Sequence, residues 1–107
     1  MKKLLLLCLV FFTGVAMADD MPTFKLELKD GTLNPARIEV PANTKFRLEV
    51  YNVGTTPIEF ESTQLRKEKV LAPGAHSSVV IQPLDPGEYK FFDEFHMSTA
   101  QGAIVAK

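Results

Sequence analysis

The sequence has no tryptophan and only one cysteine among its 107 residues. With the single thiol of Cys8, the chain cannot form a disulfide framework or a metal site with several thiolate ligands. Neither sign of charge is in excess, because 12 Lys and Arg balance 13 Asp and Glu for a net charge of −1. With this balance the chain has no large net field for binding nucleic acid or an anionic membrane. The length also excludes a large multi-domain enzyme.

The chain also lacks an apolar run long enough to span a membrane. Its longest apolar stretch is residues 4–15, preceded by Lys2 and Lys3 and followed by Ala16-Met17-Ala18. A spanning helix needs about 20 apolar residues, whereas this pattern is typical of a secretory signal peptide. We predict a signal peptide over residues 1–18, cleavage before Asp19, and a periplasmic domain over residues 19–107 with no stable membrane insertion. Cleavage would remove Cys8, leaving the domain without a thiol.

The remaining residues show short alternating runs separated by turns, and no helical periodicity is sustained. Seven or eight such strands with turn residues between them are typical of an all-β, Greek-key β-sandwich. The strands are expected around residues 24–29, 38–40, 46–51, 58–61, 70–71, 78–82, 89–91 and 102–105. Residues 63–70 are expected to hold at most one or two helical turns. The segment from Asp85 to Tyr89 resembles a tyrosine corner, in which a tyrosine fixes a Greek-key crossover.

Metal-ligating residue types gather in the loop expected between the last two strands. Asp93, Glu94, His96 and Met97 place two carboxylates, an imidazole and a thioether within five positions. Carboxylate and imidazole donors suit iron and copper ions. The alternative is a solvated loop with an incidental histidine.

A second candidate is the pair Glu59 and Glu61. Residues two apart on a strand project from the same face, so both carboxylates should lie opposite Ile58 and Phe60. The alternative is an ordinary solvent-facing strand. Since no Ser/His/Asp set or phosphate loop is visible, the sequence does not indicate a hydrolase or a kinase.

The C-terminal segment resembles the copper loop of cupredoxins. In that family a G-x-Y-x-F-x-C pattern is followed by a histidine, a glycine and a last strand. Here residues 87–93 read Gly-Glu-Tyr-Lys-Phe-Phe-Asp, followed by His96 and Gly102. Asp93 therefore stands at the cysteine position, Glu59 at the position of the first histidine, and Ala100 at the position of the axial methionine. Only His96 matches a standard ligand.

These departures make the chain more similar to the EfeO-type cupredoxin-like domains and the small periplasmic cupredoxins of bacterial iron-uptake systems. The resemblance implies a metal-binding protein that takes part in iron uptake, assisting ferrous iron oxidation or passing iron to a membrane permease. Its partners would be a periplasmic iron-binding protein and an inner-membrane iron permease. The implied ligands are Glu59, Asp93 and His96, supplemented by Glu61, Glu94 or Met97. The side chains expected to shield the site from water are Phe60, Phe91 and Phe95.

The sequence leaves two main readings open. The first is a site for a copper or iron ion, either complete in one chain or shared across a homodimer. The second is a metal-free β-sandwich used as an interaction module. A type 1 copper carrier is not expected, because its strong charge-transfer colour requires a thiolate. An autonomous oxidase is not expected either, because no second redox centre or oxygen site is apparent.

Overall fold

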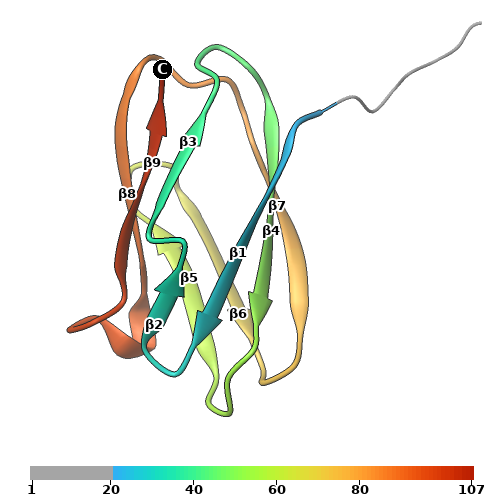
Figure 1. The fold of residues 1–107 in the computed structure, drawn as a ribbon, viewed down its shortest axis with the longest axis vertical. Coiled ribbons are helices and arrows are strands. Elements are labelled where there is room, and N and C mark those ends of the chain that lie inside the picture. The colour runs from blue at the N-terminus through green and yellow to red at the C-terminus, as the bar shows by residue number, and fades with distance from the viewer. Residues whose placement is uncertain (1–20) are drawn as a thin grey trace, which may run out of the picture.

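The computed structural model describes residues 21–107, which form two β-sheets packed face to face (Figure 1). The predicted signal peptide, residues 1–18, lies outside the described residues. One sheet has the order β2-β1-β4-β7, with β1 Thr23–Lys29, β2 Thr32–Asn34, β4 Phe46–Asn52 and β7 His76–Ile81. The other has the order β3-β9-β8-β5-β6, with β3 Arg37–Val40, β5 Ile58–Ser62, β6 Lys67–Leu71, β8 Gly87–Asp93 and β9 Gln101–Ala106. The predicted all-β sandwich is confirmed.

The core lies between the two sheets and follows from period-two alternation in the strands. On β4, Phe46, Leu48 and Val50 are fully buried, and the intervening residues face outward. From the opposite sheet, the rings of Phe60 and Phe91 meet with centroids 5.5 Å apart. Residues 21–107 contain no cysteine, so no disulfide bond stabilises the domain that they form. Its stability depends on core packing of this kind.

Two strands of the described region differ from what the sequence indicated. The three-residue strand β2 pairs with β1 across the turn at Asp30 and Gly31. The strand β6 contains the strand expected at residues 70–71 but begins earlier, at Lys67, within the segment that was expected to hold at most one or two helical turns. A turn through Arg66, which has φ of 58°, folds β6 back onto β5 as a hairpin, and this pairing buries Leu71. Tertiary pairing therefore overrides the weak local pattern.

The tyrosine corner is confirmed. The hydroxyl of Tyr89 donates a hydrogen bond of 2.8 Å to the carbonyl oxygen of Asp85. This bond ties the start of β8 to the connection from β7, which crosses from one sheet to the other. The sequence from Asp85 to Tyr89 thus fixes where the chain enters the second sheet.

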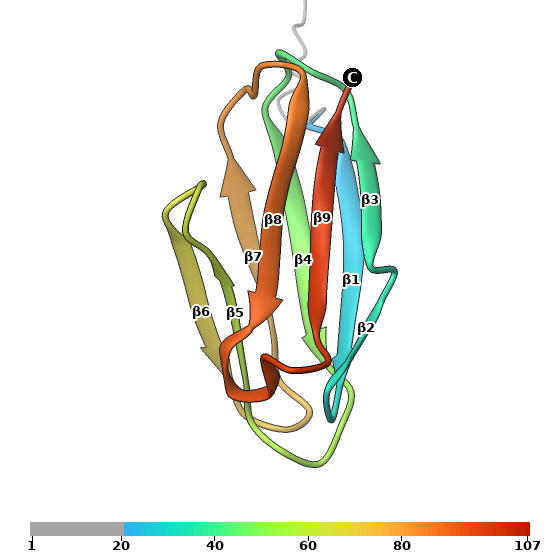
Figure 2. The ribbon, with the colours of Figure 1, turned by 90° about the vertical axis from the view of Figure 1, so that its left-hand side faces the viewer.

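One end of the sandwich gathers the loops that carry the candidate residues. The β1–β2 turn, the β4–β5 loop and the short 3-10 helix η1 (Glu94–His96) all lie at the end opposite the C-terminus (Figure 2). Because strand pairing fixes where each strand ends, these segments meet although they are far apart in the sequence. Within residues 21–107, no helix has the length and apolar character needed to cross a membrane.

Candidate functional site

Asp93 is the last residue of β8 and has no exposed surface. Its Oδ1 atom accepts hydrogen bonds of 3.0 Å from the backbone N–H groups of Glu59 and Phe95. The second of these bonds caps the N-terminus of η1. Its Oδ2 atom lies 2.7 Å from Nδ1 of His96. Both carboxylate oxygens are therefore used to join β5, β8 and η1.

His96 is held at both ring nitrogens. Besides the contact of Nδ1 with Asp93, its Nε2 atom lies 3.3 Å from the hydroxyl of Thr56 in the β4–β5 loop. Its side chain is 24% exposed. A carboxylate that holds one nitrogen of an imidazole is the arrangement that orients histidine ligands in metal sites. Ligation through Nε2 would require Thr56 to move aside.

Asp30, in the β1–β2 turn, extends this arrangement into what we call the end-loop network (Asp30, Thr55, Thr56, Asp93 and His96). Its Oδ1 atom accepts hydrogen bonds from the backbone N–H groups of Thr55 and Thr56, at 2.9 and 3.0 Å, and from the Thr56 hydroxyl at 2.8 Å. The hydrogen bond from the Thr55 backbone, followed by that from the Thr56 hydroxyl, lowers the pKa of Asp30 below its usual value. The network links the three loops of this end.

The substitution Thr56→Val tests the network. It removes the hydroxyl donor to Asp30, so we expect the pKa of Asp30 to rise toward its usual value, as measured by NMR titration of the side-chain carboxyl. Since a lowered pKa stabilises the fold above the unfolded-state pKa, that contribution is lost as pH falls through the range between the two values. Thr56→Val should make this acid loss smaller. Thr32→Val, which removes a hydroxyl bonded only to the Lys29 carbonyl, is the matched control and should leave Asp30 unchanged. Equal shifts in both variants would contradict the assignment.

A second arrangement lies on the outer face of the five-stranded sheet. Glu59, Glu61 and Glu68, which we call the glutamate cluster, each offer a carboxylate oxygen, and these atoms all lie within 4.8 Å of one another. The predicted placement of Glu59 and Glu61 on one face of β5 is confirmed, because Ile58 and Phe60 are buried on the other. Glu68 joins them because it pairs directly with Glu61 across the β5–β6 hairpin.

The surroundings of the glutamate cluster disfavour the charged forms of Glu59 and Glu61. Desolvation raises the pKa of Glu59 above its usual value, and the charges of Glu68, Glu94 and Asp93 raise it further. Desolvation likewise raises the pKa of Glu61, helped by a hydrogen bond and repulsion from Glu94 and by the charge of Glu68. Like charges placed directly opposite on paired strands are destabilising. No side-chain ion pair with a Lys or Arg relieves them within residues 21–107.

The other predicted residues are divided between these two places. Glu94 lies in η1 beside Glu61, whereas Met97 follows η1 and is 47% exposed. Phe60 and Phe91 are fully buried in the core, and their shielding of an ion stays a prediction, whereas Phe95 is 50% exposed and does not form the expected shield. The reason is that η1 turns the backbone outward after Asp93, so Phe95 leaves the alternation of β8. Within the described residues, no other three His, Cys, Asp or Glu side chains bring ligand atoms as close as the glutamate cluster.

The donor chemistry decides which ions these residues fit. The domain from residue 21 onward contains no cysteine, so a thiolate-ligated copper site does not fit it. Both oxygens of Asp93, which stands at the cysteine position of the resemblance, are already used as hydrogen-bond acceptors. The glutamate cluster offers only carboxylate oxygens, which suit hard cations and Cu(II) better than Cu(I).

Sequence reasoning missed Glu68, Thr56 and Asp30. Glu68 precedes the strand that was expected at residues 70–71, so its pairing with Glu61 could not be anticipated without the hairpin. Residues 67–71 give little signal of their own, because three charged residues precede a single apolar pair instead of alternating with apolar ones. Asp30 and Thr56 carry no local signal, because turn residues of these types are common without a functional role.

Comparisons with known proteins agree with this architecture. The family model described as "Cupredoxin-like domain" matches residues 3–106. The uncharacterized protein RP394 of Rickettsia prowazekii (strain Madrid E) is 35% identical over 114 residues, covering 97% of this chain and 91% of that protein.

Solved structures with low sequence identity share the fold. The metal binding domain of the Cu(I) exporting P-type ATPase CopA of Streptococcus pneumoniae D39 superimposes with a TM-score of 0.73 at 11% identity, covering 86% of this chain and 91% of that one. Reduced auracyanin from Roseiflexus castenholzii gives a TM-score of 0.67 at 13% identity, with 83% and 99% covered. The purple cupredoxin from Nitrosopumilus maritimus gives 0.59 at 17% identity, with 78% and 98% covered. By the family model that spans it, the chain belongs to the cupredoxin-like domains.

Proposed function

We propose that the protein is an exported, metal-binding cupredoxin-like protein that holds its ion on the glutamate cluster. The observation that carries this proposal is the approach of three carboxylates within 4.8 Å, with the pKa values of Glu59 and Glu61 raised. A divalent or trivalent cation would replace the mutual repulsion of these carboxylates with attraction. Glu94, beside Glu61, is placed to add a further oxygen.

The ion in this proposal is iron or Cu(II). Two structural neighbours are named for copper or as a cupredoxin, which favours copper, whereas the all-oxygen donor set is equally suited to iron. When bound, iron held by carboxylates would be stabilised in its higher oxidation state. The similarity to cupredoxins of iron-uptake systems supports a role in the periplasm beside an iron-binding protein and an inner-membrane permease.

Calorimetric titration of the metal-free protein with Cu(II) in air, and with Fe(II) without oxygen, tests the site. We expect one ion to bind with a micromolar or lower Kd, which corresponds to about −8 kcal/mol or stronger. The double substitution Glu59→Gln/Glu61→Gln should weaken binding at least about tenfold, or 1.4 kcal/mol, because it removes two of the three converging carboxylates.

A matched control separates local ligation from general charge. Glu27→Gln/Glu49→Gln makes the same change of net charge on the outer face of the other sheet and should leave the affinity unchanged. His96→Ala should also leave it largely unchanged. If His96→Ala abolished binding and the glutamate substitutions did not, the ion would be held in the end-loop network instead. If neither ion bound, the proposed function would be wrong.

The second candidate is a metal-free interaction module, favoured by the exposure of Phe95 and Met97 on either side of His96. These two side chains, about half exposed in one short segment, would give a partner an apolar contact. Glu94 beside them would favour a partner with basic residues. Absence of metal binding, together with a folded and stable protein, would leave this candidate in place.

A further inference from the structure

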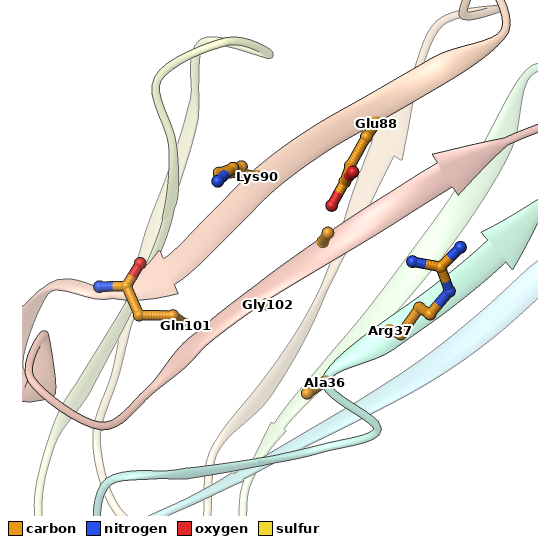
Figure 3. A pocket seen from close by; sticks show the side chains of 7 residues that line it. Ala36, Arg37, Glu88, Lys90, Gln101 and Gly102 are labelled. Carbon is orange, nitrogen blue, oxygen red and sulfur yellow. The ribbon is translucent and has the colours of Figure 1, made fainter.

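The outer face of the five-stranded sheet has a second feature, away from the glutamate cluster. A hollow of about 320 Å³ lies across β3, β9 and β8 (Figure 3). Its floor consists of small residues on β9 and before β3, and its walls consist of longer polar side chains. The side chains around it belong to Ala36, Arg37, Glu88, Lys90, Gln101 and Ala103.

Strand register explains why the hollow exists. Ala103 pairs with Arg37 on one side and with Lys90 on the other, so two long cationic side chains flank a single methyl group. Neighbouring strands lie about 4.8 Å apart, which places the backbones of Arg37 and Lys90 roughly 10 Å apart. In the next row the position of Ala103 is taken by the larger Val105, which sits between Glu39 and Glu88. The space is therefore closed at that end.

The charges around the hollow are only partly neutralised. Lys90 has no carboxylate oxygen within 4.0 Å among residues 21–107. Arg37 reaches Glu39 only through Nε, at 3.8 Å, and Glu39 makes the shorter contact, 3.2 Å, with Lys107. The terminal nitrogens of Arg37 thus remain free to bind an anion, which a guanidinium does with two parallel hydrogen bonds.

Glu88 adds a hydrogen-bond acceptor to the two cations of the hollow. Figure 3 shows its carboxylate over the floor, between the side chains of Lys90 and Arg37. The charged residues that line the hollow are two cations and one carboxylate, so the lining itself carries one positive unit, which suits a singly charged anion. A ligand whose carboxylate meets the cations can also donate a hydrogen bond from a neighbouring hydroxyl group to Glu88.

We propose that this hollow binds a small hydroxycarboxylic acid, with Arg37 and Lys90 holding its carboxylate and Glu88 accepting from its hydroxyl group. The binding would be independent of a metal ion and would not involve the end-loop network. Because the hollow is open to solvent, its electrostatic contribution is screened by salt. We therefore expect a Kd in the millimolar range at low ionic strength.

The test is an NMR titration of the purified metal-free protein with lactate and with propionate, which has the same carbon skeleton without the hydroxyl. Lactate should shift the backbone amide signals of Lys90, Gly102 and Ala103 saturably and bind several-fold more tightly than propionate. Arg37→Gln/Lys90→Gln should lose this binding. Glu88→Ala should remove the preference for lactate, because the acceptor for the hydroxyl is gone.

Two controls keep the result specific. Ala103→Leu keeps both cations but fills the floor, so it should weaken binding at least fivefold if the hollow itself is the site. Lys29→Gln/Lys45→Gln makes the same charge change elsewhere and should have no effect. Any of three results would overturn the proposal. The first is an unchanged lactate affinity in Ala103→Leu, and the second is an equal loss of affinity in the two double variants. The third is a set of amide shifts that do not saturate with lactate. A preserved amide spectrum shows that each variant is folded.

Discussion

Asp93→Ala is expected to destabilise the protein by about 3 kcal/mol or more, because it leaves three groups without their hydrogen-bond partner. The carboxylate is fully buried and accepts from the backbone of Glu59, the backbone of Phe95 and the ring of His96. Each buried polar group left without a partner costs about 1–3 kcal/mol. Chemical denaturation at neutral pH measures the loss, which is a large fraction of the stability of a small domain.

Asp93→Asn is the matched comparison. The amide keeps an oxygen for the two backbone N–H groups and places an NH₂ group toward Nδ1 of His96, which can accept in its other tautomer. We expect a loss of about 1–2 kcal/mol, clearly smaller than that of the alanine variant. If Asp93→Ala cost less than about 1 kcal/mol, Asp93 would not hold β5, β8 and η1 together as the structure indicates.

Gly102→Ala is expected to cost about 2–3 kcal/mol, since the added Cβ has no room. It would lie 2.6 Å from the carbonyl oxygen of Ala36 and 2.7 Å from Cζ of Phe91. Neither neighbour yields easily. The Ala36 carbonyl accepts a hydrogen bond of 2.9 Å from the backbone of Ala103, and Phe91 is fully buried in the core. Thermal and chemical denaturation report the change.

Gly74→Ala provides the opposite case. Gly74 has φ of +84° but no atom within 4 Å of the added Cβ, so only backbone strain opposes the substitution. That strain is worth about 1–2 kcal/mol for a non-glycine residue. We expect Gly102→Ala to be the more damaging of the two. Equal losses would mean that β9 shifts to accommodate the methyl group and that the crowding at Gly102 is not decisive.

The fold could be predicted because its signals are local. Alternation in residues 46–51 and 58–61 indicates strands with one buried face, and β4 and β5 show this pattern. The turn at Asp85-Pro86-Gly87 and the following Tyr89 indicate the crossover that the hydrogen bond to Asp85 confirms. By contrast, β2 and β6 have short or highly charged segments, and these strands form only because a neighbouring strand offers backbone partners.

The candidate site could be predicted only in part. Asp93, His96, Glu59 and Glu61 are recognisable by residue type, yet whether they share one site depends on distances that no pattern contains. The structure uses Asp93 and His96 in the end-loop network and joins Glu59 and Glu61 with Glu68 instead. Their ligation of a metal ion stays a prediction that the titrations described above will test.

The sequence by itself determined the all-β class, the outward placement of Glu59 and Glu61, and the absence of cysteine from residues 21–107, because these depend on residue type and period-two alternation. Only the tertiary structure decided that Asp93 is buried with both oxygens in use, that Phe95 faces solvent, and that Glu68 lies opposite Glu61. The physical reason is that burial and cross-strand contact depend on register and sheet packing. These join residues up to 68 positions apart, as the hydrogen bond from Thr99 to Gly31 shows.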